Sequence, residues 1–176
     1  DLLSGPARSA LNALQPSPTP YPEQQLAHEF FEHQIDQSPT RLAVRHGAQK
    51  LDYAALEARA NQLAHCLRAR GVGRGSLVGL MLARSTDMLA AVLGVLKSGA
   101  GYVPMDPCFP PDRLAFMVED AALAALLVDD AAPDSFAFPS SCLLSLTRDA
   151  AEIDGAATTR LPQDAQSASP ESVAYL

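Results

Sequence analysis

Two histidines near the start of the chain have the residue types of a metal-binding helix but not its spacing. His28 and His33 frame the run His-Glu-Phe-Phe-Glu-His, so they lie five positions apart. On a helix this separation turns the two side chains about 140° from one another, whereas zinc-binding His-Glu-x-x-His helices place both histidines on one face. We therefore predict a solvated helix face here and no metal site.

A glycine-rich run, Gly-Val-Gly-Arg-Gly-Ser at residues 71–76, has the composition of a nucleotide-binding loop. It follows a predicted helix and precedes a predicted strand. That order is the reverse of the one that directs backbone amides at a pyrophosphate. The run therefore indicates a helix C-terminal cap and a turn, without a cofactor.

Two polar positions lie near predicted helix starts. Arg84 and Ser85 fall where a strand meets a helix, at the carboxyl edge of a sheet, where ligands bind in α/β proteins. Ser85 is most simply an N-cap, and a direct ligand role for the pair is the alternative. Arg113, beside Asp112, is expected to form a salt bridge or to pack.

The remaining reactive side chains have no recognisable partner in the sequence. His46 falls at a predicted hairpin tip and His65 in the middle of a predicted helix. Cys66 falls next to the inward seam of that helix, which is typical of a small core residue rather than a nucleophile. We assign no catalytic, cofactor-binding or metal-ligating residue to this chain.

The composition describes one globular domain. The chain has 176 residues, 48% of them hydrophobic and 19% charged, with a net charge of −7. The negative charge and scattered basic residues argue against nucleic acid or an anionic membrane as a partner. Cys66, Cys108 and Cys142 lie far apart, which predicts free thiols in a cytoplasmic protein. The apolar runs are too short to span a bilayer.

Hydrophobic periodicity predicts an α/β fold. A helix from Glu23, with Leu26, Phe30, Phe31 and Ile35 facing inward, precedes a hairpin that turns at Gly47. Helices and strands then alternate, which requires right-handed helical crossovers and a largely parallel sheet. The predicted strands after the hairpin are residues 77–82, 102–103, 124–128 and 142–146, and the predicted helices are residues 53–70, 86–96 and one that begins at Pro111. Residues 155–170 are expected to form a loop.

The most informative stretch is residues 96–107, Leu-Lys-Ser-Gly-Ala-Gly-Tyr-Val-Pro-Met-Asp-Pro. It combines a helix end, a glycine stop, a short strand and a proline-rich turn. Gly99 is predicted to cap the helix with a left-handed backbone, and Lys97 places a positive charge on the last helical turn. The small residues Ala100 and Gly101 indicate close approach of an adjacent strand.

This stretch closely resembles the second core motif of the adenylation domains of nonribosomal peptide synthetases, which are adenylate-forming enzymes. The family pattern is Leu-Lys-Ala-Gly-x-Ala-Tyr-(Val/Leu)-Pro-(Leu/Ile)-Asp, and this chain departs from it at Ser98, Gly101 and Met105. Residues 51–56 are similar to the first core motif, Leu-Thr-Tyr-x-Glu-Leu. There Asp52 keeps an N-cap oxygen.

Further matches lie on both sides. Residues 109–114 resemble the family's Tyr-Pro-x-Glu-Arg-Leu segment. Tyr21-Pro22, His28 and Phe31-Glu32 match the run that leads from a condensation domain into an adenylation domain. The resemblance implies an inter-domain linker with a short helix at residues 1–22, in which prolines alternate with small or polar residues. Residues 23–176 are then the N-terminal part of the large subdomain.

The resemblance also implies a function for the parent enzyme. It would use ATP and Mg²⁺ to form an aminoacyl-adenylate and pass the acyl group to phosphopantetheine on a carrier protein domain. The expected partners are the rest of the adenylation domain, an upstream condensation domain and the carrier domain. Residues 172–176 resemble the strand that leads into the family's phosphate loop, so we expect this chain to supply scaffold without the catalytic motifs.

Other interpretations remain open. One is a fragment of an acyl-CoA synthetase-type ligase. Another is a non-catalytic module that docks a condensation domain through residues 1–35. A small nucleotide-binding α/β protein is disfavoured, because no phosphate loop follows any predicted strand.

Overall fold

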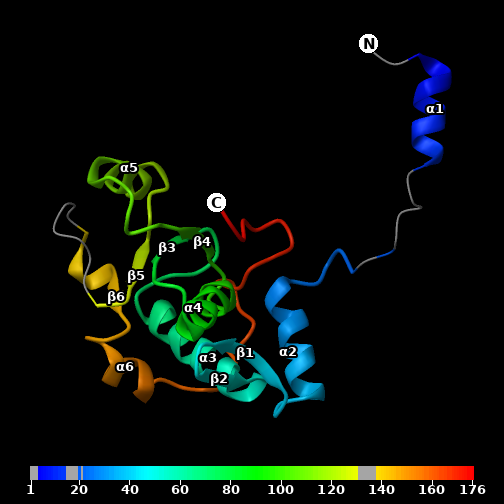
Figure 1. Ribbon diagram of the computed structural model, residues 1–176. Helices are drawn as coiled ribbons and strands as arrows, with labels where there is room; N and C mark the ends of the chain where they lie inside the picture. The colour runs from blue at the N-terminus through cyan, green and yellow to red at the C-terminus, as the bar shows by residue number, and fades with distance from the viewer. Residues whose placement is uncertain (1–3, 15–19, 21, 131–137) are drawn as a thin grey trace.

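Four parallel strands form the centre of the structure (Figure 1). It is a computed structural model that describes residues 4–14, 20, 22–130 and 138–176. The strand order is β4-β3-β5-β6, and every neighbouring pair is parallel. The strands are β3 (Leu77–Met81), β4 (Gly101–Pro104), β5 (Ala125–Val128) and β6 (Leu143–Ser145). The predicted α/β fold with a largely parallel sheet is confirmed.

The strands β4 and β5 lie on opposite sides of β3, and the helices that connect the strands cover both faces of the sheet. The connection from β3 to β4 runs through α4 (Thr86–Lys97), and the connection from β4 to β5 runs through α5 (Pro111–Asp120). Val78 and Leu80 pack on one face with α4, with α3 (Tyr53–Ala69) and with α6 (Ala150–Gly155). Met81 and Leu126 pack on the other face with Leu114 of α5. Two cores therefore sandwich the sheet.

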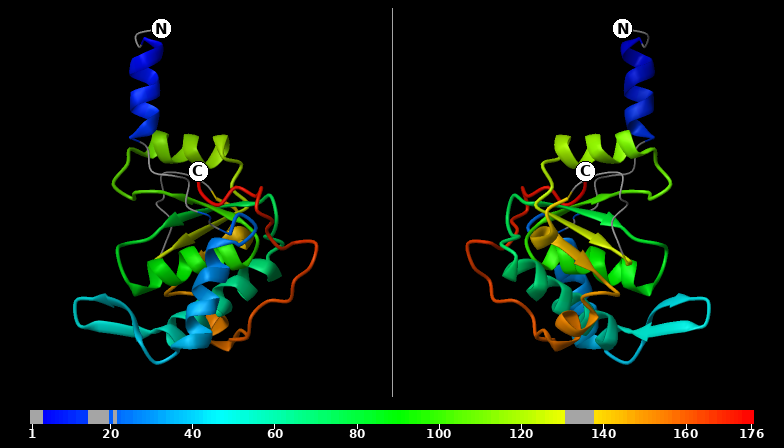
Figure 2. Two further views of the ribbon diagram at one scale, coloured as in Figure 1. Left: turned by 90° about the vertical axis from the view of Figure 1, so that its right-hand side faces the viewer. Right: turned by 90° about the vertical axis from the view of Figure 1, so that its left-hand side faces the viewer.

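The first two strands do not belong to this sheet. β1 (Leu42–His46) and β2 (Gln49–Asp52) form a separate antiparallel pair, which projects from the body of the molecule in Figure 2. Gly47 lies in their turn with φ of +58°. Only two residues join the strands, and so short a connection allows only an antiparallel pair. The hairpin was predicted correctly, and the structure keeps it apart from the parallel sheet.

Helix α2 (Ala27–Gln37) turns Phe31 and Ile35 toward the core, as predicted, but it differs from the prediction at Phe30 and His28. His28 is buried, as is Ile35, whereas Phe30 is 48% exposed. Phe31 packs on the core and against the ring of Tyr53, with centroids 5.5 Å apart. The helix begins at Ala27 rather than near Glu23, and His28 lines a cavity together with Lys97 of α4 (Thr86–Lys97). The prediction of a solvated face was therefore wrong for His28.

For α3 and α4, the predicted helix starts and inward-facing residues agree better with the structure. The Asp52 carboxylate accepts a hydrogen bond from the amide of Ala55 at 2.8 Å, and the Ser85 hydroxyl accepts one from Met88 at 3.1 Å. Both residues are N-caps, as predicted. The inward positions of α3, buried as expected, are Leu56, Ala60, Leu63 and Leu67.

The chain ends show the largest departures from prediction. The short helix predicted near the start is α1 (Gly5–Ala13), which has no buried residue. Residues 1–3, 15–19 and 21 of the predicted linker lie outside the described residues, and they include Tyr21 of the matched Tyr-Pro pair. α6 was not predicted; it follows a short 3-10 helix (Ser140–Cys142) and β6. The strand predicted at residues 172–176 is reduced to one parallel bridge between Tyr102 and Tyr175.

Gly99 has the predicted left-handed backbone, with φ of +92°, directly after the end of α4. The close approach of an adjacent strand was predicted correctly at Gly101, which lies beside Leu77 of β3, whereas a loop makes the close approach at Gly99. A β-carbon at Gly99 would lie 2.0 Å from the carbonyl oxygen of Gln166. A side chain here is therefore opposed both by backbone strain and by a steric clash.

We expect Gly99→Ala to lower the free energy of unfolding by about 2–4 kcal/mol, because it combines the strain with the clash. Gly75→Ala is the matched control: φ there is +83°, but a β-carbon would meet no atom within 4 Å. The control should cost only about 1 kcal/mol. Denaturant unfolding at equal slope measures both, and equal losses would show that the contact with Gln166 is unimportant.

Candidate functional site

The loops that follow the parallel strands meet at the carboxyl edge of the sheet, where α/β proteins bind ligands. Asp129 forms hydrogen bonds with the loop after β3 and with the loop after β6. Its carboxylate accepts a hydrogen bond from the amide of Ala83 at 2.8 Å, and its carbonyl accepts one from Thr147 at 2.9 Å. Among the described residues that follow the strands, none of the segments 82–85, 105–110, 129–130 and 146–149 contains glycine. These segments therefore lack the glycine-rich backbone that cradles phosphates.

The arginines near this edge have different surroundings. Arg84 is exposed beside Ser85, whose hydroxyl is occupied as an N-cap. The guanidinium of Arg113 lies 4.0 Å from the centre of the Phe109 ring. This is a cation–π contact worth about 0.5–1 kcal/mol at an exposed site. Of the two roles expected for Arg113, the structure shows packing.

The glycine-rich run at residues 71–76 caps α3 and turns the chain toward β3. Gly71 has φ of +80°, and its amide donates to the carbonyl of Arg68 at 2.9 Å. The amide of Val72 donates to the carbonyl of Leu67 at 3.1 Å, which satisfies a further carbonyl of the last turn. The predicted helix cap and turn are confirmed.

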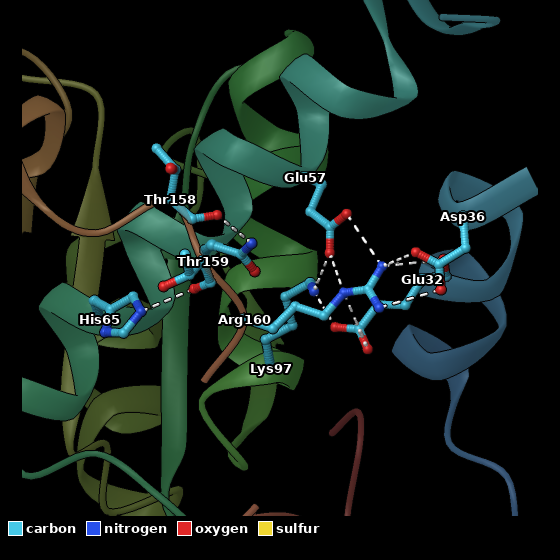
Figure 3. Close-up of polar contacts among 9 residues, drawn as sticks. Glu32, Asp36, Glu57, His65, Lys97, Thr158, Thr159 and Arg160 are labelled. Atoms are coloured by element: carbon cyan, nitrogen blue, oxygen red, sulfur yellow. Dashed lines mark hydrogen bonds and ion pairs between the residues drawn. The ribbon is translucent and has the colours of Figure 1, made fainter. Parts of the chain in front are cut away.

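The most concentrated group of charges lies elsewhere, between α2, α3, α4 and the loop after α6 (Figure 3). We call it the ion cluster; it consists of Glu32, Asp36, Glu57, Lys97 and Arg160. The Lys97 side chain is only 3% exposed. Its ammonium donates to the carboxylates of Glu32 and Glu57, the latter at 3.2 Å. An ammonium this deeply buried requires such partners, because desolvation costs several kcal/mol.

Arg160 brings the loop after α6 into the ion cluster. Its guanidinium donates to Glu57 Oε1 at 2.7 Å, to Asp36 Oδ1 at 2.7 Å and to the backbone carbonyl of Glu32 at 3.2 Å. The hydrogen bonds to Glu57 and Asp36 raise the pKa of Arg160. Burial raises the pKa of Glu57, but hydrogen bonds from Arg160 and Lys97 outweigh it and hold that pKa below its usual value.

The ion cluster is arranged for support rather than for proton transfer. Each of its three carboxylates already accepts from a cation, and none is left as a free base. Lys97 was expected only to place a charge at a helix end, and its burial between two carboxylates was missed. The one available signal was Glu32 in the Phe-Glu pair of the resemblance, and sequence alone could not bring it near Lys97.

A cavity of about 210 Å³ adjoins the ion cluster, between α2 and the loop at residues 160–168. His28, Lys97 and Arg160 line it together with Gln163 and Ser167. Burial lowers the pKa of His28, although Glu32 nearby acts in the opposite direction. The neutral imidazole is therefore favoured at the cavity wall.

The other reactive side chains are dispersed. The ring of His65 contacts the carbonyl of Thr159 at 3.0 Å, and His33 contacts Gln37 on the exposed side of α2. Cys66, Cys108 and Cys142 are free thiols, as predicted. Burial raises the pKa of Cys66, which disfavours a nucleophilic thiolate. Within the described ranges no group of three metal-ligating side chains converges, and no helix is long and apolar enough to cross a membrane.

The arrangement of strands and helices is that of an adenylate-forming fold, and the sequence model of the AMP-binding enzyme family matches residues 31–176. The chain belongs to the AMP-binding enzyme family.

Its relatives are peptide synthetases. A linear gramicidin synthase of Brevibacillus parabrevis is 48% identical over 117 residues, which cover 66% of this chain and 2% of that protein. Bacitracin synthase 1 of Bacillus licheniformis is 42% identical over 122 residues, which cover 69% of this chain and 2% of that protein. The chain thus spans a small part of these relatives.

Solved structures agree with this assignment. A crystal structure of the nonribosomal peptide synthetase FmoA3 superimposes with a TM-score of 0.84 at 28% identity, over 99% of this chain and 18% of that chain. The N-terminal subdomain of Klebsiella oxytoca NpsA has a TM-score of 0.68 at 21% identity, over 82% of this chain and 36% of that chain, which shows the fold alone. The resemblance to peptide-synthetase adenylation domains is confirmed.

We expect Lys97→Met to lower the free energy of unfolding by about 3–5 kcal/mol at pH 7, because it removes the more deeply buried of the two cations that pair with Glu32 and Glu57. The folded-state pKa of Glu57 is lowered, so this contribution is present above the ordinary glutamate pKa of about 4.3 and is lost as the pH falls through the folded value. The difference between the two proteins should therefore shrink below about pH 4.3.

Arg148→Met is the control for this prediction, because Arg148 pairs with Asp149 while its side chain is 51% exposed. It should change the unfolding midpoint little at any pH. Urea unfolding from about pH 3.5 to about pH 7 measures all three proteins. If Lys97→Met lowered the free energy of unfolding no more than Arg148→Met does, the ion cluster would not stabilise the fold.

We also expect the three thiols to react in the order of their exposure. Cys108 is exposed, Cys142 is partly buried and Cys66 is buried. A thiol reagent followed by mass spectrometry should label Cys108 first and Cys66 last, and unfolding without reductant should reveal three thiols. A count of one thiol would contradict the assignment.

Proposed function

We propose that this chain forms the N-terminal part of the large subdomain of an adenylation domain in a nonribosomal peptide synthetase. The observation that carries the proposal is the family match over residues 31–176, together with 48% identity to a linear gramicidin synthase. Residues 1–22 are then an inter-domain linker, in keeping with a first helix that has no buried residue.

The parent enzyme activates an amino acid. It uses ATP and Mg²⁺ to form an aminoacyl-adenylate, with release of pyrophosphate, and passes the acyl group to phosphopantetheine on a carrier domain. Structures of FmoA3, 28% identical to this chain, include forms bound to AMPPNP and to alpha-methyl-L-serine-AMP. An upstream condensation domain and the rest of the adenylation domain complete the proposed set of partners.

The described residues of this chain do not fit the phosphates or the metal ion themselves. The loops at the carboxyl edge lack glycine, and no group of metal-ligating side chains converges in the described part of the chain. Its contribution is scaffold: the parallel strands, the ion cluster and the segment that runs beside β4.

Two alternatives are less well supported. An acyl-CoA synthetase fragment shares the fold: the N-terminal domain of FACL13 from Mycobacterium tuberculosis has a TM-score of 0.69, but its identity is only 20%. The curated relatives at 42–48% identity are peptide synthetases. A docking module formed by residues 1–35 is favoured only by the exposure of α1.

A chimaera tests the proposed function. Residues 23–176 replace the matching segment of an adenylation domain of the Brevibacillus parabrevis linear gramicidin synthase, and amino-acid-dependent pyrophosphate exchange is measured. We expect activity within about tenfold of the unaltered domain, with the same amino acid preferred, because the exchanged segment carries no catalytic group. The 176-residue chain alone should remain at background.

The unaltered domain and the isolated chain serve as controls. A chimaera that is folded by circular dichroism but has no exchange activity would contradict the proposal. So would robust exchange by the 176-residue chain.

A further inference from the structure

We propose that residues 98–102 form a docking surface for the chain's own residues 164–176, and that Arg68 is the positioning residue that holds this segment beside β4. We call residues 164–176 the edge segment. The effect of this docking on catalysis rests on the proposed function, because that function requires a nucleotide to be held beyond this edge of the sheet.

The first contact is made at two glycines. A β-carbon at Gly99 would lie 2.0 Å from the carbonyl oxygen of Gln166, and one at Gly73 would lie 2.4 Å from Oε1 of the same residue. The Gln166 carbonyl also accepts a hydrogen bond from the amide of Arg74 at 2.9 Å. The backbone of Gln166 therefore occupies a space that depends on the missing side chain at Gly99, and its side chain lies against Gly73.

The second contact lies at the start of β4. A β-carbon at Gly101 would lie 2.5 Å from the carbonyl oxygen of Val173. The amide of Tyr102 donates to the carbonyl of Ala174 at 3.0 Å, and the carbonyl of Tyr102 accepts from Leu176 at 3.1 Å. The edge segment thus runs parallel to β4 in a fixed register.

The edge segment is not held by burial of its own apolar side chains. Val173 is 57% exposed, Tyr175 is 62% exposed and Leu176 is 58% exposed. Figure 2 shows residues 156–176, in orange to red, following the outside of the molecule to the edge of the sheet. Its position therefore depends on hydrogen bonds, on the fit at the glycines and on the contact between the rings of Tyr175 and Tyr102, whose centroids lie 5.3 Å apart.

Arg68 joins the docking surface to the edge segment directly. Its Nε donates to the carbonyl of Ser98 at 2.7 Å, and its Nη1 donates to both carboxylate oxygens of Asp164, each at 3.0 Å. The Arg68 side chain is only 13% exposed, so the pair is partly shielded from water. One side chain thus connects the end of α4 with the start of the edge segment.

Arg70 provides a matched control at the end of the same helix. It lies two residues from Arg68, its side chain is 16% exposed, and it forms a comparable pair with Glu152 at 2.6 Å and 2.9 Å. Glu152 belongs to α6 and not to the edge segment. Arg68→Met and Arg70→Met each remove one guanidinium and retain an apolar stem, but only the first should release the edge segment.

Amide hydrogen exchange of the full 176-residue chain tests the docking. In Arg68→Met we expect the amides of Arg74, Tyr102 and Leu176 to exchange about tenfold faster than in Arg70→Met. The amide of Gly101, which donates to Ser76 within the sheet, should be unchanged and serves as the internal reference. Asp164→Ala leaves the bond between Arg68 and Ser98 in place and should also accelerate the same three amides.

Equal exchange at these amides in Arg68→Met and Arg70→Met would overturn the proposal, as would acceleration that includes Gly101.

A second readout uses the chimaera. There Arg68→Met should raise the KM for ATP about tenfold relative to Arg70→Met, with kcat less affected, because a displaced edge weakens binding before chemistry. An unchanged KM would overturn the catalytic role. An inactive wild-type chimaera would count against the proposed function, while hydrogen exchange would still decide the docking.

Discussion

The structure depends on neutralising one buried ammonium group. Lys97 is 3% exposed at the end of the helix that crosses over from β3 to β4. An unpaired charge in that position would destabilise the fold by several kcal/mol, so carboxylates must reach it from neighbouring elements. Glu32 comes from α2 and Glu57 from α3, and Arg160 then balances the excess negative charge. Three helices and the loop after α6 are thereby fixed around one point.

Close backbone approach is the second constraint, and it acts just beyond the same lysine. Gly99 and Gly101 stand where the carbonyls of Gln166 and Val173 pass within 2.0 Å and 2.5 Å of the place a β-carbon would occupy. The core motif at residues 96–107 thus has two structural roles. Lys97 binds carboxylates of α2 and α3, and Gly99 and Gly101 leave room for the backbone of Gln166 and Val173.

The proposed role of the described residues as scaffold is consistent with how their charges and glycines are used. The charges of the ion cluster are paired with one another, and the loops at the carboxyl edge lack the glycines that phosphate binding requires. The family match over residues 31–176 places the segment in the AMP-binding enzyme family. Under the proposed function, residues of this chain would affect catalysis through the position of the sheet edge.

The sequence by itself determined the local structure and the family. Asp52 and Ser85 were recognised as N-caps, Gly99 as a left-handed cap and the later strands as a parallel sheet, because each depends on neighbouring residues or on a short period. The core motif likewise lies within residues 96–107. Only the tertiary structure brought Glu32, Glu57 and Arg160 to Lys97, since these residues lie up to 128 positions apart. It also buried His28, separated the hairpin from the parallel sheet and reduced the last predicted strand to a single bridge. No local pattern contains such outcomes, because long-range packing decides which face of a helix is covered and which strand edges meet.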